Sequence, residues 1–204
     1  MSKRTALLIL AIIAPACGGA SDSSDAVVGR WELQDDDTGE LEAIYDFEAD
    51  GTYAFREYGE GAESHRGTYE TDGGLLILEG TDDEGAHLVG EVTFFADDER
   101  LILGALLPDG AVDGPVGSWS GSVHVESDGE VSIDAESTYE LESGGGATVE
   151  SRSGSQSETR DGTWAEEEGE IVVSFDVSGV TVNVHMVLIE GSALGSPIYQ
   201  RDSD

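Results

Sequence analysis

Apolar and polar residues alternate with a period of two in run after run of this chain. From Val131 to Glu142 the odd positions are mostly apolar and the even positions are polar, and residues 41–48 and 180–188 repeat the pattern. A period of two places alternate side chains on opposite faces of an extended strand, whereas a helix requires a period of 3.6. No stretch after residue 26 keeps a helical period for ten residues. The pattern therefore predicts strands with one buried face and one wet face.

Glycine-containing turns separate these runs at short intervals. Examples are Asp50-Gly51, Asp128-Gly129 and Glu168-Gly169, and the chain has 28 Gly but only 4 Pro. Such dipeptides join neighbouring antiparallel strands through tight turns. Short strands, glycine turns and the lack of a helical pattern predict an all-β fold of antiparallel hairpins in meander order.

The two halves of the chain carry similar short motifs in the same order. Gly29-Arg30-Trp31 matches Gly117-Ser118-Trp119, and Gly67-Thr68-Tyr69 matches Gly162-Thr163-Trp164. This self-similarity predicts an internal duplication. We expect one β-repeat over residues 26–107, a turn-rich connector over 108–115 and a second β-repeat over 116–204. Tandem domains and a single merged sheet or barrel are both compatible with the pattern.

The first 25 residues have the layout of a secretion signal followed by a spacer. Lys3 and Arg4 precede an apolar run over residues 6–14, and Ala14-Pro15-Ala16-Cys17 follows. This segment resembles the lipobox of bacterial lipoproteins, although that family prefers Leu where Ala14 stands. The resemblance implies a signal peptide over residues 1–17, lipidation of Cys17 and a flexible tether over 18–25. The alternative is an ordinary secretory signal cut near Ala16.

The charge of the chain excludes one class of partner. Acidic residues outnumber basic ones by 44 to 9, which gives a formal net charge of −35. Such a chain repels nucleic-acid backbones, so we expect no nucleic-acid partner. The acids are spread along the chain, which favours a role in solubility or salt adaptation over binding of calcium or a basic partner. Because Cys17 is the only cysteine, the chain can form neither an internal disulfide nor a cysteine-based zinc site.

The motifs of the body resemble a family of small β-domains. Gly-x-Trp, an acidic hairpin, Tyr-x-Phe and Asp-Gly-Thr-Tyr follow one another in the first half. This order is similar to that of bacterial lipocalin-like lipoprotein domains, over most of residues 27–106 and more loosely over 115–201. The resemblance implies two tandem lipocalin-like barrels. It also implies that a late arginine, Arg201, packs over the indole of Trp119. At the position of the first half that corresponds to Arg201, the chain has Leu106. The resemblance therefore does not say how the first barrel closes.

Few residues suggest catalysis or metal binding. The four histidines, His65, His87, His124 and His185, form no His-x-His pair, and no Gly-x-Ser-x-Gly motif occurs. Carboxylates are too abundant for a catalytic pair to be recognised. The acidic segments 35–37 and 82–84 lack EF-hand spacing and are expected to be hairpin turns. We therefore expect no enzymatic activity, no cofactor and no metal.

The expected function is a non-enzymatic, membrane-tethered binding or interaction lipoprotein of the bacterial cell envelope. An Asp directly after the lipidated cysteine resembles an inner-membrane retention signal. This chain has Gly18 at that position, which favours the outer membrane. The expected partners are the membrane, through the lipid anchor, and a small apolar ligand or a protein. Two alternatives are a lipocalin-type carrier of a small apolar ligand and a structural or adhesive envelope protein. The matched aromatics are expected to fill two cores, and the apolar segment 101–107 is expected either to pack between the halves or to form a partner patch.

Overall fold

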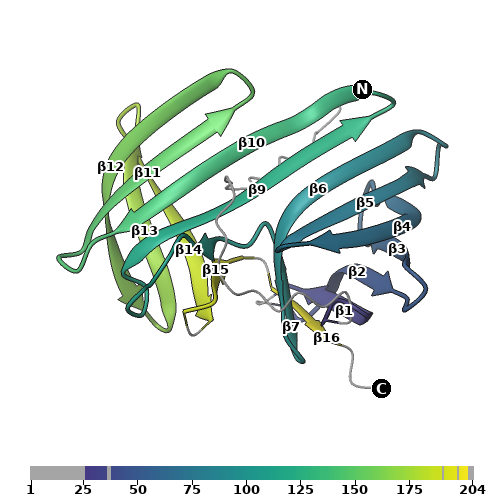
Figure 1. Ribbon diagram of the computed structural model, residues 1–204, viewed down its shortest axis with the longest axis horizontal. Helices are drawn as coiled ribbons and strands as arrows, with labels where there is room; N and C mark the ends of the chain where they lie inside the picture. The colour runs from purple at the N-terminus through teal and green to yellow at the C-terminus, as the bar shows by residue number, and fades with distance from the viewer. Residues whose placement is uncertain (1–25, 36–37, 190, 197, 202–204) are drawn as a thin grey trace.

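The computed structural model describes residues 26–35, 38–189, 191–196 and 198–201, and these form antiparallel strands joined by turns (Figure 1). The predicted all-β class is confirmed: the described residues contain no α-helix. The strands are β1 (Gly29–Gln34), β2 (Leu41–Phe47), β3 (Thr52–Glu57), β4 (Ser64–Asp72), β5 (Leu75–Asp82), β6 (His87–Ala96), β7 (Arg100–Leu103), β8 (Leu107–Pro108), β9 (Gly117–Ser127), β10 (Glu130–Leu141), β11 (Gly146–Ser153), β12 (Gln156–Glu167), β13 (Glu170–Val177), β14 (Val180–Ile189), β15 (Ala193–Gly195) and β16 (Tyr199–Arg201).

Eight of these strands close into an antiparallel barrel. Strands β6, β5, β4, β3, β2 and β1 follow one another, β16 and β7 come next, and β7 returns to pair with β6. This closed barrel is consistent with the lipocalin-like fold that the motifs predicted. Strands β9 to β15 continue the same sheet in meander order beyond β6 (Figure 1). The sheet is therefore continuous across both halves of the chain.

The sheet forks at Thr93 on β6. Before Thr93, β6 pairs with β9, and after it, the same edge of β6 pairs with β7. The buried Thr93 hydroxyl donates to the Ala105 carbonyl at 2.9 Å and accepts the Ser122 amide at 2.7 Å. A Cβ at Gly121 would lie 2.0 Å from that Ala105 carbonyl oxygen. The fork is thus held by close backbone approach and by a fully bonded hydroxyl.

Three apolar clusters make up the core. The first fills the eight-stranded barrel around Trp31, Phe47 and Leu101, and the second lies under β9–β15 around Trp119 and Leu106. The third joins Ile102, Ala105 and Leu107 to Ile189 and Ala193, which come from opposite halves of the chain. The segment 101–107 therefore packs between the halves, which was one of the two roles predicted for it.

Each tryptophan pairs with a short strand from outside its own predicted repeat. Strand β16 pairs with β1, so that Arg201 lies opposite Trp31 with its guanidinium carbon 4.5 Å from the centre of the indole. The prediction that Arg201 packs over Trp119 is wrong, because β16 belongs to the first barrel. Pro108 of β8 lies opposite Trp119 instead, and Leu106 packs in the same cluster. Arg201, and not Leu106, is the residue that packs against Trp31 where the first barrel closes.

The repeated motifs occupy equivalent positions in the two halves. The indole N–H of Trp31 donates to the Val27 carbonyl at 2.7 Å, and that of Trp119 donates to the Pro115 carbonyl at 2.8 Å. Both carbonyls lie four residues before their tryptophan. Tyr45 and Tyr139 lie opposite Trp31 and Trp119 in the neighbouring strands β2 and β10. The proposed repeat boundaries at 107 and 116 remain a prediction.

Candidate functional site

Aromatic side chains occupy the interior of the eight-stranded barrel. The ring of Tyr45 lies 4.6 Å from Phe55, 5.4 Å from Phe47 and 5.5 Å from Tyr199, measured between ring centres. Burial raises the pKa of the Tyr53 phenol to about 12, as expected for a hydroxyl shielded from water. Close ring packing of this kind is typical of a filled small barrel.

His65 on β4 is part of this interior. Its ring stacks on Phe55 at 4.5 Å, and its Nδ1 lies 3.1 Å from the Tyr53 hydroxyl. Burial lowers the pKa of His65 to about 4, against a smaller opposing effect of the Asp82 carboxylate. His65 is therefore neutral near pH 7 and is a half-buried residue within hydrogen-bond distance of Tyr53.

The lowered pKa of His65 predicts a loss of stability in mild acid. The unfolded chain binds a proton near pH 6.5, whereas the folded chain binds it only near pH 4, so the free energy of unfolding falls as the pH drops through this window. Urea denaturation between pH 7 and pH 4 should show this fall, and His65→Gln should make the curve flatter. An equally steep curve for the variant would contradict the assignment.

The other three histidines pair with carboxylates on the surface. His87 lies 3.3 Å from Glu79 and His185 lies 2.8 Å from Glu170. His124 lies between Glu126 and Asp134; burial opposes its protonation, but hydrogen bonds to the two carboxylates raise its pKa. Within the described residues, no group of three or more His, Cys, Asp or Glu side chains is placed to hold a metal ion.

Carboxylates of the acidic segments bind backbone amides of their own turns. The Asp82 carboxylate accepts the amides of Glu84 and Ala86 at 2.9 and 2.8 Å. The Asp35 carboxylate accepts the amide and the hydroxyl of Thr38 at 2.7 and 2.8 Å. These contacts are Asx-type turns, which stabilise the connections between strands.

A hollow of about 410 Å³ lies over strands β1–β5. Its size is in the range of small-molecule sites. We call it the arginine groove, because arginines line its walls. Its lining residues are Arg30, Ile44, Asp46, Ala54, Phe55, Arg56, Tyr58, Ser64, His65, Arg66, Thr81, Asp82 and Asp83.

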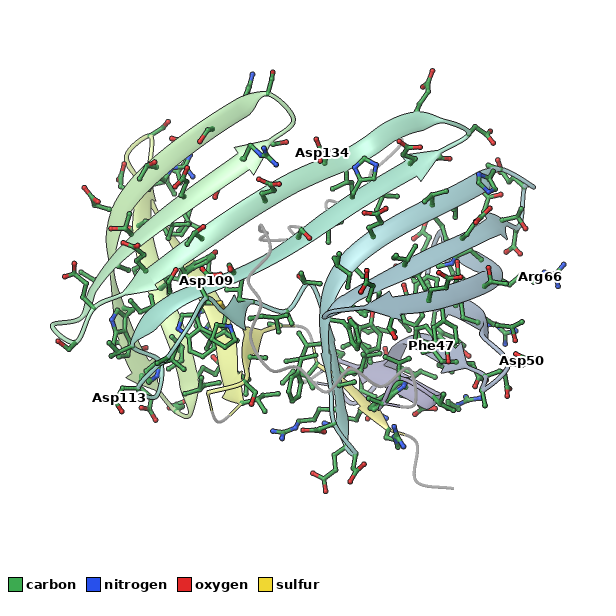
Figure 2. All side chains as sticks on the ribbon, viewed as in Figure 1. Phe47, Asp50, Arg66, Asp109, Asp113 and Asp134 are labelled. Atoms are coloured by element: carbon green, nitrogen blue, oxygen red, sulfur yellow. The ribbon has the colours of Figure 1, made fainter. Side chains whose placement is uncertain are left out.

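The strand register explains why the arginines gather in this groove. Arg30 lies opposite Asp46, Asp46 opposite Ala54, and Ala54 opposite Arg66, so the four residues form one row across β1–β4. Arg56 follows Ala54 by two residues and shares its face of the sheet. Phe47 points into the barrel and Arg66 points away from it (Figure 2). The row of arginines is therefore on the outer face of the barrel, and the groove also reaches Phe55 and His65 at the border of the aromatic interior.

Two arginines of the groove have no acidic partner in the part of the chain that the structure describes. Of the nine basic residues Lys3 and Arg4 precede Cys17, which leaves seven arginines. Four of the seven pair with carboxylates (Arg30–Glu32, Arg100–Asp97, Arg152–Glu136 and Arg160–Glu158), and Arg201 lies on Trp31. Among the described residues, Arg56 and Arg66 have no ion pair. Such isolation is unexpected in a chain with 44 acidic residues.

The sequence-predicted residues do not meet at this groove. Cys17 lies outside the described residues, and Trp31 and Trp119 are fully buried, each in a different cluster. Sequence reasoning missed the groove. One signal was available in the sequence. The chain is poor in basic residues, yet Arg30, Arg56 and Arg66 all lie on the polar faces of predicted strands that are close in sequence.

Comparison with known proteins yields no relative. No family model matches the chain, and no curated protein or solved structure matches it. Within the described residues, no helix is long and apolar enough to span a membrane.

Proposed function

We propose that this protein is a non-enzymatic binding lipoprotein of the bacterial cell envelope, tethered to the outer membrane through a lipid on Cys17. The support for the tether is the leader, in which a basic start and a short apolar run end at the single cysteine. Residues 18–25 then act as a spacer between the lipid and the first strand.

The observation that carries the binding role is the arginine groove on the outer face of the barrel. Ring packing around Tyr45 occupies the interior, which favours a surface site over a lipocalin-type cavity for an apolar ligand. The groove offers a hollow of about 410 Å³ with the guanidinium groups of Arg56 and Arg66, for which the described residues supply no ion pair. Arginine and tyrosine are the residues that most often dominate binding surfaces.

We further propose that the body arose by duplication into two lipocalin-like repeats. The equivalent indole hydrogen bonds of Trp31 and Trp119 support this proposal, as do the matching strand registers around them. The isolated β-bridge between Leu106 and Leu194 also supports the proposal, because it brings the end of the β9–β15 meander next to β8.

Substitution of the lipidated residue tests the tether. Cys17→Ser removes the thiol that would carry the lipid, so the protein should leave the membrane fraction and run at a different mobility in gels. Two or more acyl chains anchor a protein far more firmly than one, which makes the expected shift nearly complete. Fractionation of cells expressing either form measures it. An unchanged membrane fraction with unchanged mobility would contradict the proposal.

Native mass spectrometry of the protein extracted from its host in mild detergent tests the binding role. A bound small molecule would appear as a mass above that of the lipidated chain, and a protein partner would appear as a complex. A bare monomer from several growth conditions, with no capture of ligand from a host metabolite extract, would count against a binding lipoprotein.

A further inference from the structure

We propose that the arginine groove binds a small organic carboxylate, with Arg56 and Arg66 holding the carboxylate group. This inference rests on the proposed binding function and specifies its ligand.

The position of the two arginines argues for an anion between them. Arg66 lies opposite Ala54, and Arg56 lies opposite Ser64 in the β3–β4 pair, so the two arginines are diagonal neighbours on one face. Like charges this close on a sheet destabilise it unless something compensates them. In the described part of the chain no carboxylate pairs with either side chain. A bound anion would supply that compensation.

The charges around the groove favour one negative charge over two. Three arginines line it, and so do the three acids Asp46, Asp82 and Asp83. Asp82 is bound to turn amides, and Asp83 accepts the Ser64 hydroxyl at 2.6 Å. These fixed carboxylates lower the positive potential of the site, which penalises a phosphate dianion more than a carboxylate. Guanidinium groups match the planar carboxylate geometry with two parallel hydrogen bonds.

Apolar groups beside the arginines indicate that the ligand has an apolar body. Ile44 faces the groove at 6% exposure, and the short side chain of Ala54 leaves room above the sheet. Tyr58 is 40% exposed and lines the same hollow. An exposed tyrosine next to arginines supplies a flat contact surface for a ring or chain.

Titration calorimetry of the lipidated protein in detergent tests the proposal. The probes are phenylacetate, phenyl phosphate and the neutral analogue 2-phenylethanol. Phenylacetate should bind saturably, and each of the other two should bind at least about tenfold more weakly, a difference of roughly 1.4 kcal/mol. Arg56→Gln and Arg66→Gln should each weaken phenylacetate by about tenfold or more. Acetate serves as a fourth probe: Tyr58→Ser should weaken phenylacetate binding but leave acetate binding unchanged.

Matched variants separate this result from general effects of charge or folding. Arg152 pairs with Glu136, and both residues lie in the second half, outside the groove. Arg152→Gln should therefore leave phenylacetate binding unchanged. Arg66→Lys keeps the charge but not the paired donors, and an intermediate affinity is expected. Thermal melting of each variant reports whether it folds.

Several outcomes would overturn the carboxylate assignment. They are an absence of saturable phenylacetate binding, equal affinity for 2-phenylethanol, tighter binding of phenyl phosphate, or unchanged affinity in both arginine variants when these fold. If the ligand found by native mass spectrometry stays bound to the double variant Arg56→Gln/Arg66→Gln, the protein is a binding lipoprotein but its ligand does not use this groove.

Discussion

A chain that ends at Ser196 is expected to lose about 4 kcal/mol or more of its free energy of unfolding. This truncation removes β16, whose Tyr199 is 8% exposed and packs in the first core cluster. It also removes Arg201 from the indole of Trp31 and leaves β1 without a partner on that side. Loss of a large buried aromatic side chain alone costs about 3–5 kcal/mol, and the strand pairing adds to it.

Urea denaturation followed by tryptophan fluorescence measures this loss, and a chain that ends at Arg201 is the control. The control keeps β16 and should unfold at nearly the urea concentration of the full chain. The truncated chain should unfold at a much lower concentration. If both chains unfolded alike, β16 would not be closing the barrel.

Gly121→Ala is expected to lower the free energy of unfolding by about 3 kcal/mol, at the upper end of the range for overpacking. The new Cβ would lie 2.0 Å from the Ala105 carbonyl oxygen and 2.4 Å from the Thr93 hydroxyl. Neither atom moves freely, because that hydroxyl donates to Ala105 and accepts from Ser122. The substitution must therefore push β9 away from the fork in the sheet.

Gly90→Ala on β6 is the matched control. Its Cβ would meet only the Leu78 Cβ at 3.9 Å, which is ordinary contact. The loss of backbone freedom in the unfolded chain should make this variant about as stable as the parent. Thermal unfolding of the two variants under identical conditions compares them. Similar melting temperatures would show that the fork tolerates an added methyl group.

Local patterns were sufficient to predict the strands and the class of fold. The period of two along β10 and β14 follows directly from which face of each strand is buried. The short motifs around Trp31 and Trp119 were also sufficient to match the halves, because each motif places its indole at the same point of a strand pair.

The sequence did not reveal which segment packs against the tryptophan of each half. Arg201 and Leu106 occupy corresponding places after the two tryptophans, and nothing local says that each packs with the tryptophan of the other half. That choice depends on the fork at Thr93 and on contacts between strands far apart in the chain. The arginine groove was missed for a related reason, since its row of residues comes from four strands and becomes visible only once their register is known.

The placement of β16 also sets the order in which the molecule can be completed during synthesis. Strand β1 leaves the ribosome long before its partner β16, because the hydrogen bond from Arg201 to the Ala26 carbonyl joins residues 175 positions apart. Contacts so distant in sequence form slowly. Until they form, β1 and β7 expose unpaired edges, which are the usual starting points of aggregation. The half that is made first is therefore incomplete until β16 has been made, and a chain that stops before β16 leaves that half open at both β1 and β7.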